Sequence, residues 1–510
     1  MTSGLRRRLR TWLLPTELPQ LPLSAGRDAL FVRLLGLLYF IAFASLWPQV
    51  PGLFGEHGLL PTEVMLGSVA SQLGTRKYLL LPTVFWLSQT STALLFVCGL
   101  GMLSGLLVGA LRLTWPMLAV AWLCHLSFLA IGGPFLAFQW DALLSELGLL
   151  GLLALLAVPI RWRRPQPLVL VALGRWLLLW LLIRLQFGSG WVKLAAGDPT
   201  WRNLTALHYH FETQPLPTVL GYYAHALPGV IKKALVVFTL VTETLLPMLI
   251  LVPRWHRLVL WPMLGLQLGI LLTGNYGYFN LEVLVLLLLL VPPSWLSRLR
   301  PTPGPTTDEP SQITTPPSLL WSLPRVMLAT VLFCASLGHL LWTVRFRTSV
   351  PPVIHQAMQI TAPLQAVSHY GPFASMTTTR PELVIEGSQD GNSWTEYALR
   401  YKPGDVLRRP RWSAPHQPRL DWQFWFAALG KPSDSPWLEV LLLRLLEGSP
   451  DVLWLFESDP FQGRRPRYVR VRLYQYRFTT PSEQRRTGAY FVREAPLPFI
   501  SPVGLSVSEP

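Results

Sequence analysis

The chain has 510 residues, of which 51% are hydrophobic and only 14% are charged, against about 25% charged residues in soluble domains. This composition excludes an ordinary soluble domain and predicts a protein that crosses a membrane several times. The formal net charge of +16 does not indicate a nucleic-acid partner, because the basic residues punctuate apolar runs and form no patch flanked by aromatic residues.

Nine apolar runs predict the α-helices of a multi-span membrane protein. They are residues 30–47, 91–111, 113–131, 143–158, 168–187, 234–252, 258–273, 278–291 and 320–344. Several are shorter than the ~20 residues that a perpendicular helix needs, so we expect tilted or merged spans. The predicted order is a cytoplasmic tail (1–29), a multi-pass transmembrane region (30–300), a Pro/Thr-rich linker (301–319), a last transmembrane helix (320–344) and an exported domain (345–510).

The basic residues between these spans predict the topology. With a cytoplasmic N-terminus, nine spans place Arg112, the cluster Arg161–Arg164, Arg254 and Arg298 inside, where short loops carry the excess of basic residues. The loop 186–228 and everything after Val344 then face the ER lumen of a eukaryote or the periplasm of a bacterium.

The C-terminal part reads as a small exported α+β or β-rich domain. Two strands flank the turn at residues 389–392, and residues 468–478 alternate as a strand does. A helix is predicted over residues 421–429, which begins at Asp421. Its Trp422, Trp425, Phe426 and Leu429 recur on one helical face. This stripe is either the core of the domain or a surface that docks on the membrane part or on the loop 186–228.

The loop 186–228 is too polar to cross a bilayer, so it is either a re-entrant or interfacial structure or a functional site. Its site candidates are Trp191, Lys193, Asp198, Trp201, His208, His210 and Glu212. Lys193 follows two glycines in an aromatic setting, where desolvation would lower its pKa and make it a base. The alternative is a lysine that snorkels from a helix end to water.

Metal and cofactor sites are not predicted. His208 and His210 are two residues apart, a spacing that puts both on one face only in a strand, and no third ligand is near in sequence. An interfacial polar belt explains them better. The cysteines, Cys98, Cys124 and Cys334, all lie in predicted spans without a C-x-x-C motif. Their scarcity, with the dominance of Arg over Lys, mildly favours a bacterial inner-membrane protein.

Six ionisable residues lie in or beside the predicted spans: Asp141, Glu146, Arg175, Arg184, Glu243 and Glu282. Each costs roughly 2.5–3.5 kcal/mol at the bilayer centre, so such residues face the bundle interior and pair. We expect Arg184 to pair with Glu243 or with Glu146. Structural ion pairing and a functional polar path both remain open.

Four motifs carry a resemblance to a known family. They are FGSGWVKLAAGDPTWRNLTALHYHFETQPLP in the predicted loop, FQWDALLSELG at 138–148, GNYGYFNLEV at 274–283 and YKPGDVLRRPRWSAPHQPRLDWQFWFAAL at 401–429. In these the chain resembles the lipase maturation factor family. The resemblance implies a non-enzymatic protein of the ER membrane that helps secreted lipases fold and assemble into active dimers. Its partners would be membrane lipid and a secreted client, by resemblance a lipase.

Two alternatives from other functional classes stay open. The G-x-x-K-L sequence around Lys193 is similar to the transmembrane module of vitamin-K-dependent carboxylases, which implies a membrane enzyme with Lys193 as its base. A transporter would need a polar path between spans. No G-x-S-x-G, Walker or dinucleotide motif occurs, so nothing indicates a lipase or a nucleotide enzyme. A closed apolar cavity that ends at Lys193 would favour the enzyme, a continuous polar pore the transporter, and an exposed aromatic groove the maturation factor.

Overall fold

The computed structural model describes residues 22–155, 172–297, 319–344 and 350–505. The predicted linker, apart from Leu319, and the basic cluster Arg161–Arg164 lie outside the described residues.

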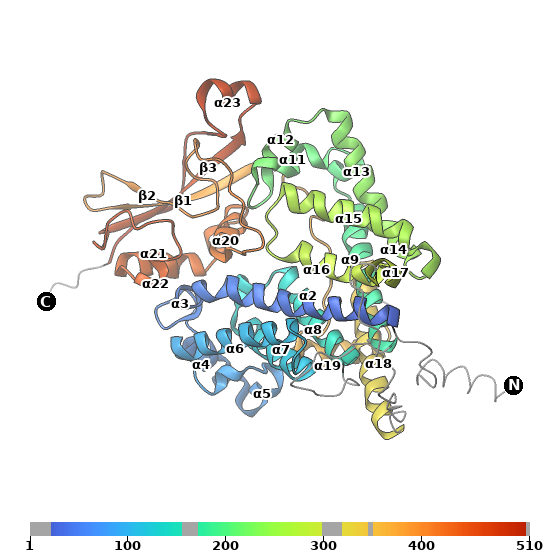
Figure 1. Cartoon of the computed structure of the whole chain (residues 1–510). Helices are drawn as coiled ribbons and strands as arrows, with labels where there is room; N and C mark the ends of the chain where they lie inside the picture. Colours follow the sequence, from blue (N-terminus) through green and yellow to red (C-terminus); the bar gives the residue numbers. More distant parts are fainter. Residues whose placement is uncertain (1–21, 156–171, 298–318, 345–349, 506–510) are drawn as a thin grey trace.

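The N-terminal half is a helical bundle (Figure 1). Its helices are α2 (Pro22–Leu46), α3 (Val50–Phe54), α4 (Thr62–Leu73), α5 (Lys77–Leu80), α6 (Ser91–Gly109), α7 (Thr114–Ile131), α8 (Gln139–Leu155), α9 (Ala172–Ala195), α10 (Pro199–Arg202), α11 (Ala206–Thr213), α12 (Val219–His225), α13 (Gly229–Thr244), α14 (Leu246–Leu249), α15 (His256–Thr273), α16 (Phe279–Leu287), α17 (Pro293–Ser297) and α18 (Leu319–Thr343).

Six helices among the described residues are long and apolar enough to cross a membrane. They cover residues 26–54, 91–109, 114–131, 172–195, 253–273 and 323–343. The multi-span helical class predicted from composition is therefore confirmed. The predicted spans 143–158 and 234–252 overlap the shorter helices α8 and α13, which begin earlier, at Gln139 and Gly229, and the span 278–291 contains α16.

Two predicted boundaries are wrong. Helix α2 begins at Pro22, so the end of the predicted tail is helical. Helix α9 runs to Ala195, so residues 186–195 belong to a helix and not to a loop. The glycines of this turn let neighbours approach closely: a Cβ on Gly188 would lie 2.7 Å from the carbonyl oxygen of Tyr370, and one on Gly190 would lie 2.8 Å from Cβ of Glu243.

The rest of the predicted loop is also mostly helical. It folds into α10, α11 and α12. Helix α10 packs at the end of α9, and α11 and α12 lie side by side (Figure 1). Side-chain caps define two of these short helices: Asp198 accepts a hydrogen bond from the backbone N–H of Thr200 at 2.6 Å, and Thr218 accepts one from Gly221 at 3.0 Å. The segment is therefore a folded layer and not a flexible connection.

The C-terminal part is an α+β domain, as predicted. Its elements are α19 (Pro352–Thr361), β1 (Arg380–Ser388), β2 (Thr395–Tyr397), α20 (Arg419–Ala428), α21 (Trp437–Glu447), α22 (Pro450–Leu453), β3 (Tyr468–Phe478), α23 (Pro481–Thr487), β4 (Phe491–Arg493) and β5 (Leu497–Val503). The sheet is antiparallel in the order β2-β1-β3-β4, and β5 also pairs with β3. The predicted hairpin is present as β1 and β2, and β3 has the predicted bounds.

The two halves pack directly on each other. Figure 1 shows the sheet and α20–α23 at one end of the molecule, beside α3, α11 and α12. One continuous cluster of buried apolar side chains contains residues of both halves, such as Phe135 and Leu143 with Trp437 and Leu441. Burying apolar area at about 25 cal/mol per Å² makes such a shared core the main force that holds the halves together.

Candidate functional site

A cavity of about 580 Å³ lies where the bundle, the short helices and α20 meet. Its walls include Lys193 of α9, His210 of α11, Glu243 of α13, Gln267 of α15 and Trp422 of α20. Aromatic and aliphatic side chains make up most of the remaining wall. The volume falls in the ~300–1,000 Å³ range of small-molecule pockets, which are typically apolar with a few placed polar groups.

Lys193 is paired inside this wall. Its side chain is only 5% exposed, and Nζ lies 2.7 Å from Oε2 of Glu243 and donates to the carbonyl oxygen of Ser189 at 3.0 Å. The ring of Trp201 lies 5.4 Å from Nζ, a cation–π distance. The snorkelling interpretation is therefore wrong, because the ammonium reaches a buried carboxylate of α13 and not water. The expected Arg184–Glu243 pair is also absent, since Glu243 pairs with Lys193.

Glu146, Arg175 and Arg184 are held by partners on separate elements. Arg184 pairs with Glu146, the other expected partner, and Glu146 also accepts a hydrogen bond from Tyr370 at 2.8 Å. Arg175 pairs with Asp28. These contacts are typical of structural ion pairing, the first of the two interpretations left open above.

Asp141 and Glu282 are the most buried acids of this set. Asp141 is bound by both terminal nitrogens of Arg419 at 2.8 Å and accepts a hydrogen bond from Tyr278 at 2.5 Å. Glu282 is fully buried, and its carboxyl oxygens have no hydrogen-bond partner within the described part of the chain.

His208 and His210 lie on a helix and not on a strand. They therefore point in different directions: Nε2 of His210 lies 3.2 Å from the hydroxyl of Tyr276 beside the cavity, whereas His208 is near Gly229. Burial, reinforced by the charge of Lys193, lowers the pKa of His210 to about 4. In the described residues no group of three side chains could hold a metal ion.

Trp191, Asp198 and Trp201 surround the end of α9. Trp191 is half-buried and stacks on Phe187. Asp198 and Trp201 bind the segment that follows α19: Oδ2 of Asp198 accepts from the backbone N–H of Met376 at 2.7 Å, and the indole of Trp201 donates to the carbonyl of Phe373 at 3.0 Å. Both residues thus position one wall of the cavity.

The end of α11 is capped by the C-terminal domain. The guanidinium of Arg380 donates to the carbonyl oxygens of Glu212, Gln214 and Pro215, and the indole of Trp425 donates to that of Thr213 at 2.8 Å. The last carbonyls of a helix have no partner within the helix and form the negative end of its dipole. A buried arginine is therefore a suitable cap, and no local sequence signal identified Arg380.

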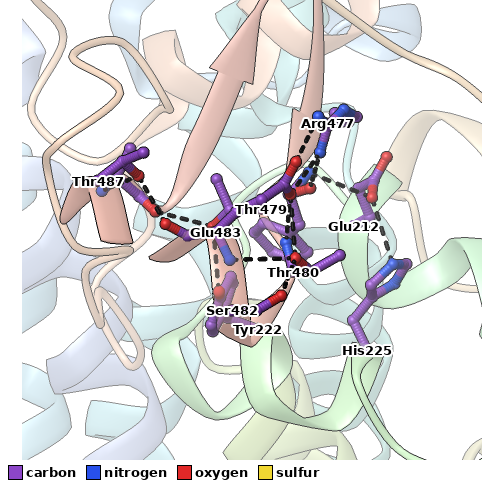
Figure 2. A network of polar contacts seen from close by, with 11 residues as sticks. Glu212, Tyr222, His225, Arg477, Thr479, Thr480, Ser482, Glu483 and Thr487 are labelled. Carbon is purple, nitrogen blue, oxygen red and sulfur yellow. Dashed lines mark hydrogen bonds and ion pairs between the residues drawn. The ribbon is translucent and has the colours of Figure 1, made fainter. Parts of the chain in front are cut away.

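The carboxylate of Glu212 extends this junction (Figure 2). It accepts from the backbone N–H of Phe478 at 3.2 Å and lies 3.4 Å from Nε2 of His225. Beside it, the hydroxyl of Tyr222 lies 3.1 Å from that of Thr479. The end of β3 is thus bound to both α11 and α12.

Helix α20 docks on the membrane half. Trp422 is buried against Phe138 and Trp140, with ring centroids 5.5 and 4.9 Å away, and Trp425 is buried against α11. The interpretation of the stripe as the core of the C-terminal domain is therefore wrong. Phe426 and Leu429, at the end of the same stripe, are 46% and 43% exposed.

The first residues of α20 fix it to both halves. Oδ1 of Asp421 accepts from the backbone N–H groups of Tyr401 and Lys402 at 2.8 Å, within the C-terminal domain. Arg419, which sequence reasoning missed, reaches Asp141 of α8 across 278 positions of sequence. An arginine at a helix start carries no signal of such a distant partner.

The histidines of the α11–α12 layer predict a loss of stability in acid. Burial, with the charge of Lys232, lowers the pKa of His225 to about 4 from 6.5. A lowered folded-state pKa means that stability is full above pH 6.5 and is lost as the pH falls toward 4. Burial raises the pKa of Glu212, so the stability that Glu212 contributes has the opposite pH dependence and is lost as the pH rises. We expect His225→Asn to reduce the fall of Tm between pH 7 and 4, measured on purified protein in detergent.

The exposed His57 provides the control for this prediction. His57→Asn should leave the pH dependence of Tm as it is in the wild type. Equal slopes for the His225→Asn variant and the wild type would show that His225 does not titrate in this way.

Fold and site together define a multi-span membrane protein whose C-terminal α+β domain is joined to its membrane helices around an apolar cavity. Residues 27–298 match the lipase maturation factor transmembrane domain, and residues 366–500 match the lipase maturation factor C-terminal domain. The chain belongs to the lipase maturation factor family.

The relatives agree with this assignment over nearly the whole chain. Lipase maturation factor 2 of Gallus gallus is 34% identical, over 94% of this chain and 81% of the relative. Human lipase maturation factor 2 is 33% identical over 89% of this chain and 80% of the relative. Bovine lipase maturation factor 1 is 30% identical over 92% of this chain and 88% of the relative. No solved structure matches the chain. These relatives are vertebrate proteins, so they give no support to the bacterial origin that composition favours.

Proposed function

We propose that this protein is a membrane-embedded maturation factor that acts from the ER membrane on secreted lipases as they fold. The observation that carries the proposal is the similarity to lipase maturation factors over both the transmembrane and the C-terminal domain. The structure fits this role, because the domain that would meet a secreted client is anchored to the membrane helices by buried contacts.

The contacts of the C-terminal domain support the predicted topology. The domain hydrogen-bonds to Gln49 at the end of the first span, to Gly58, to Asp141 at the start of α8 and to Asn275 between α15 and α16. The predicted topology places all of these positions on the non-cytoplasmic side, together with α10–α12. The basic turns at Arg112 and at Arg254 are on the opposite ends of their helices.

Cysteine labelling tests this topology. In a variant without Cys98, Cys124 and Cys334, we expect single cysteines at the exposed positions Asn203 and Asn392 to be protected from an impermeant maleimide in sealed ER vesicles. A cysteine at the exposed Arg112 should react without opening the vesicles. Labelling of positions 112 and 203 from the same side would refute the arrangement.

Secretion of active lipase tests the function. In cells that lack their own lipase maturation factors, we expect expression of this protein to raise the activity of a secreted dimeric lipase per mass of lipase in the medium. Co-expression of the lipase alone provides the baseline. Unchanged specific activity, with the protein present in the ER membrane at normal levels, would contradict the proposal.

One geometric feature is consistent with the enzyme alternative: Lys193 lines an apolar cavity. We expect Lys193→Ala to reduce lipase maturation severalfold, because it leaves the buried Glu243 without its cation, a loss of about 3–5 kcal/mol for pairs of this kind. Lys193→Arg should retain most activity, since arginine keeps the ion pair but cannot act as a base. The readout is the specific activity of the secreted lipase at matched expression.

Lys233 is the matched control. It is exposed on α13, whereas Lys232 is buried and donates to the carbonyl of His225 at 2.9 Å. Lys233→Ala should behave as wild type. Loss of activity in both Lys193→Ala and Lys193→Arg, with both variants folded, would favour a proton-transfer role for Lys193.

A further inference from the structure

The cavity is open between α13 and α15. Gly265 and Gly269 of α15 line it one helical turn apart, and a Cβ added to either would meet nothing within 4 Å. Leu235 and Phe238 of α13 line the cavity from the other side and are 37% and 38% exposed, so the cavity reaches the molecular surface here.

The surface around this opening is apolar. On α15, Leu268 and Leu272 are 42% and 46% exposed, and on α13 Val237 and Val241 are 44% and 39% exposed. Helix α15 lies in a segment long and apolar enough to cross a membrane. In a bilayer such side chains contact hydrocarbon, so the cavity is continuous with the lipid-facing surface.

Four tryptophans line the cavity with mainly carbon atoms: Trp140, Trp201, Trp422 and Trp425. The indoles of Trp201 and Trp425 donate to backbone carbonyls, and the indole N–H groups of Trp140 and Trp422 are buried away from the cavity surface. These rings therefore present apolar faces to a ligand, which suits a hydrocarbon chain.

We propose that the cavity binds one acyl chain of a membrane glycerophospholipid. The chain enters between α13 and α15. A hydrocarbon chain matches the apolar wall and brings no charge that would compete with the buried Lys193–Glu243 pair. The proposal does not depend on the identity of the client or on the maturation function.

Photolabelling of the full-length protein tests it. The protein is placed in phosphatidylcholine nanodiscs that contain a small fraction of phosphatidylcholine with a diazirine in one acyl chain. After irradiation, the labelled peptides are identified by mass spectrometry. We expect label on the buried cavity-lining residues Trp422 and Trp425 of α20 and Gln186 and Lys193 of α9. The exposed face of α6, with Phe96 and Leu103, contacts surrounding lipid and serves as internal reference.

Filling the opening should abolish the cavity signal. In Gly269→Phe we expect label on α20 to fall about tenfold relative to α6, because a filled volume holds no chain. Gly265→Leu is the second variant, in case the first does not fold. The control is Gly67→Phe on α4, where an added side chain also meets open space but does not line the cavity. Unlabelled α20 in the wild type, or undiminished label in both filled variants, would overturn the proposal.

The source of the chain is tested separately with a free fatty acid that carries the same diazirine. Label on α20 from the fatty acid but not from phosphatidylcholine would overturn the assignment to a glycerophospholipid.

Discussion

Asp141→Asn should lower the free energy of unfolding by about 3–5 kcal/mol, the range for removing one partner of a buried ion pair. Asp141 and Arg419 are 0% and 1% exposed, and both terminal nitrogens of the guanidinium bind the carboxylate at 2.8 Å. The pair joins the first turn of α8 to the first turn of α20. Its loss leaves a buried arginine without its anion. The measurement is the Tm of the purified full chain, followed by tryptophan fluorescence.

The control for this variant is Glu457→Gln. Glu457 pairs with Arg408 and Arg411 but is 33% exposed, and exposed pairs contribute about 0–1 kcal/mol. We also expect Asp141→Leu combined with Arg419→Met to lose less than the sum of its single variants, because an apolar pair replaces two charges. Similar Tm values for Asp141→Asn and Glu457→Gln would show that the pair does not hold the halves together.

The elements predicted well are those whose signal is local. Hydropathy alone indicates α6, α7 and α18, and the alternation of residues 468–478 gives β3 with its observed bounds. The turn at Asp390 is also predicted from its own residues, because the Asp390 carboxylate accepts hydrogen bonds from the backbone N–H groups of Asn392 and Ser393 at 2.8 Å. In each case the residues that decide the structure are neighbours in sequence.

The errors occur where distant partners satisfy polar groups. Lys193 looks too polar for a span, yet α9 includes it because α13 supplies Glu243 and the carbonyl of Ser189 accepts from its ammonium. The apolar stripe on α20 predicts a helix, but it does not predict which element that helix packs against. Trp422 finds that neighbour in Trp140, far away in the chain. Pairings of this kind are set by tertiary structure, which periodicity does not encode.

The cavity shows the same limit. Sequence reasoning identified Lys193, Trp201, His210, Glu243 and Trp422 as separate candidates in three different categories. The fold brings all five to the lining of one cavity. What was missed is the role of Gly265 and Gly269, because a glycine that leaves space open has no chemical signature of its own.

Arg380→Met should also be strongly destabilising, by about 3–5 kcal/mol as for other buried charges that lose a partner. Arg380 is 1% exposed and pairs with Glu382 at 2.7 Å while it caps the end of α11. Without it, the carbonyls of Gln214 and Pro215 lose their donor in a buried place. We expect a lower Tm and faster hydrogen exchange over residues 206–216, measured on the full chain by mass spectrometry.

Arg477→Met is the matched control, because Arg477 lies on the same junction but is 47% exposed in its pair with Glu483 (Figure 2). It should change stability by less than about 1 kcal/mol. Arg380→Lys should fall between the two, since one ammonium cannot reproduce the planar fork that reaches three carbonyls. If Arg380→Met and Arg477→Met show the same Tm and the same exchange over α11, the arginine cap does not join the C-terminal domain to the short helices. The anchor would then rest on Trp425 and on the Asp141–Arg419 pair.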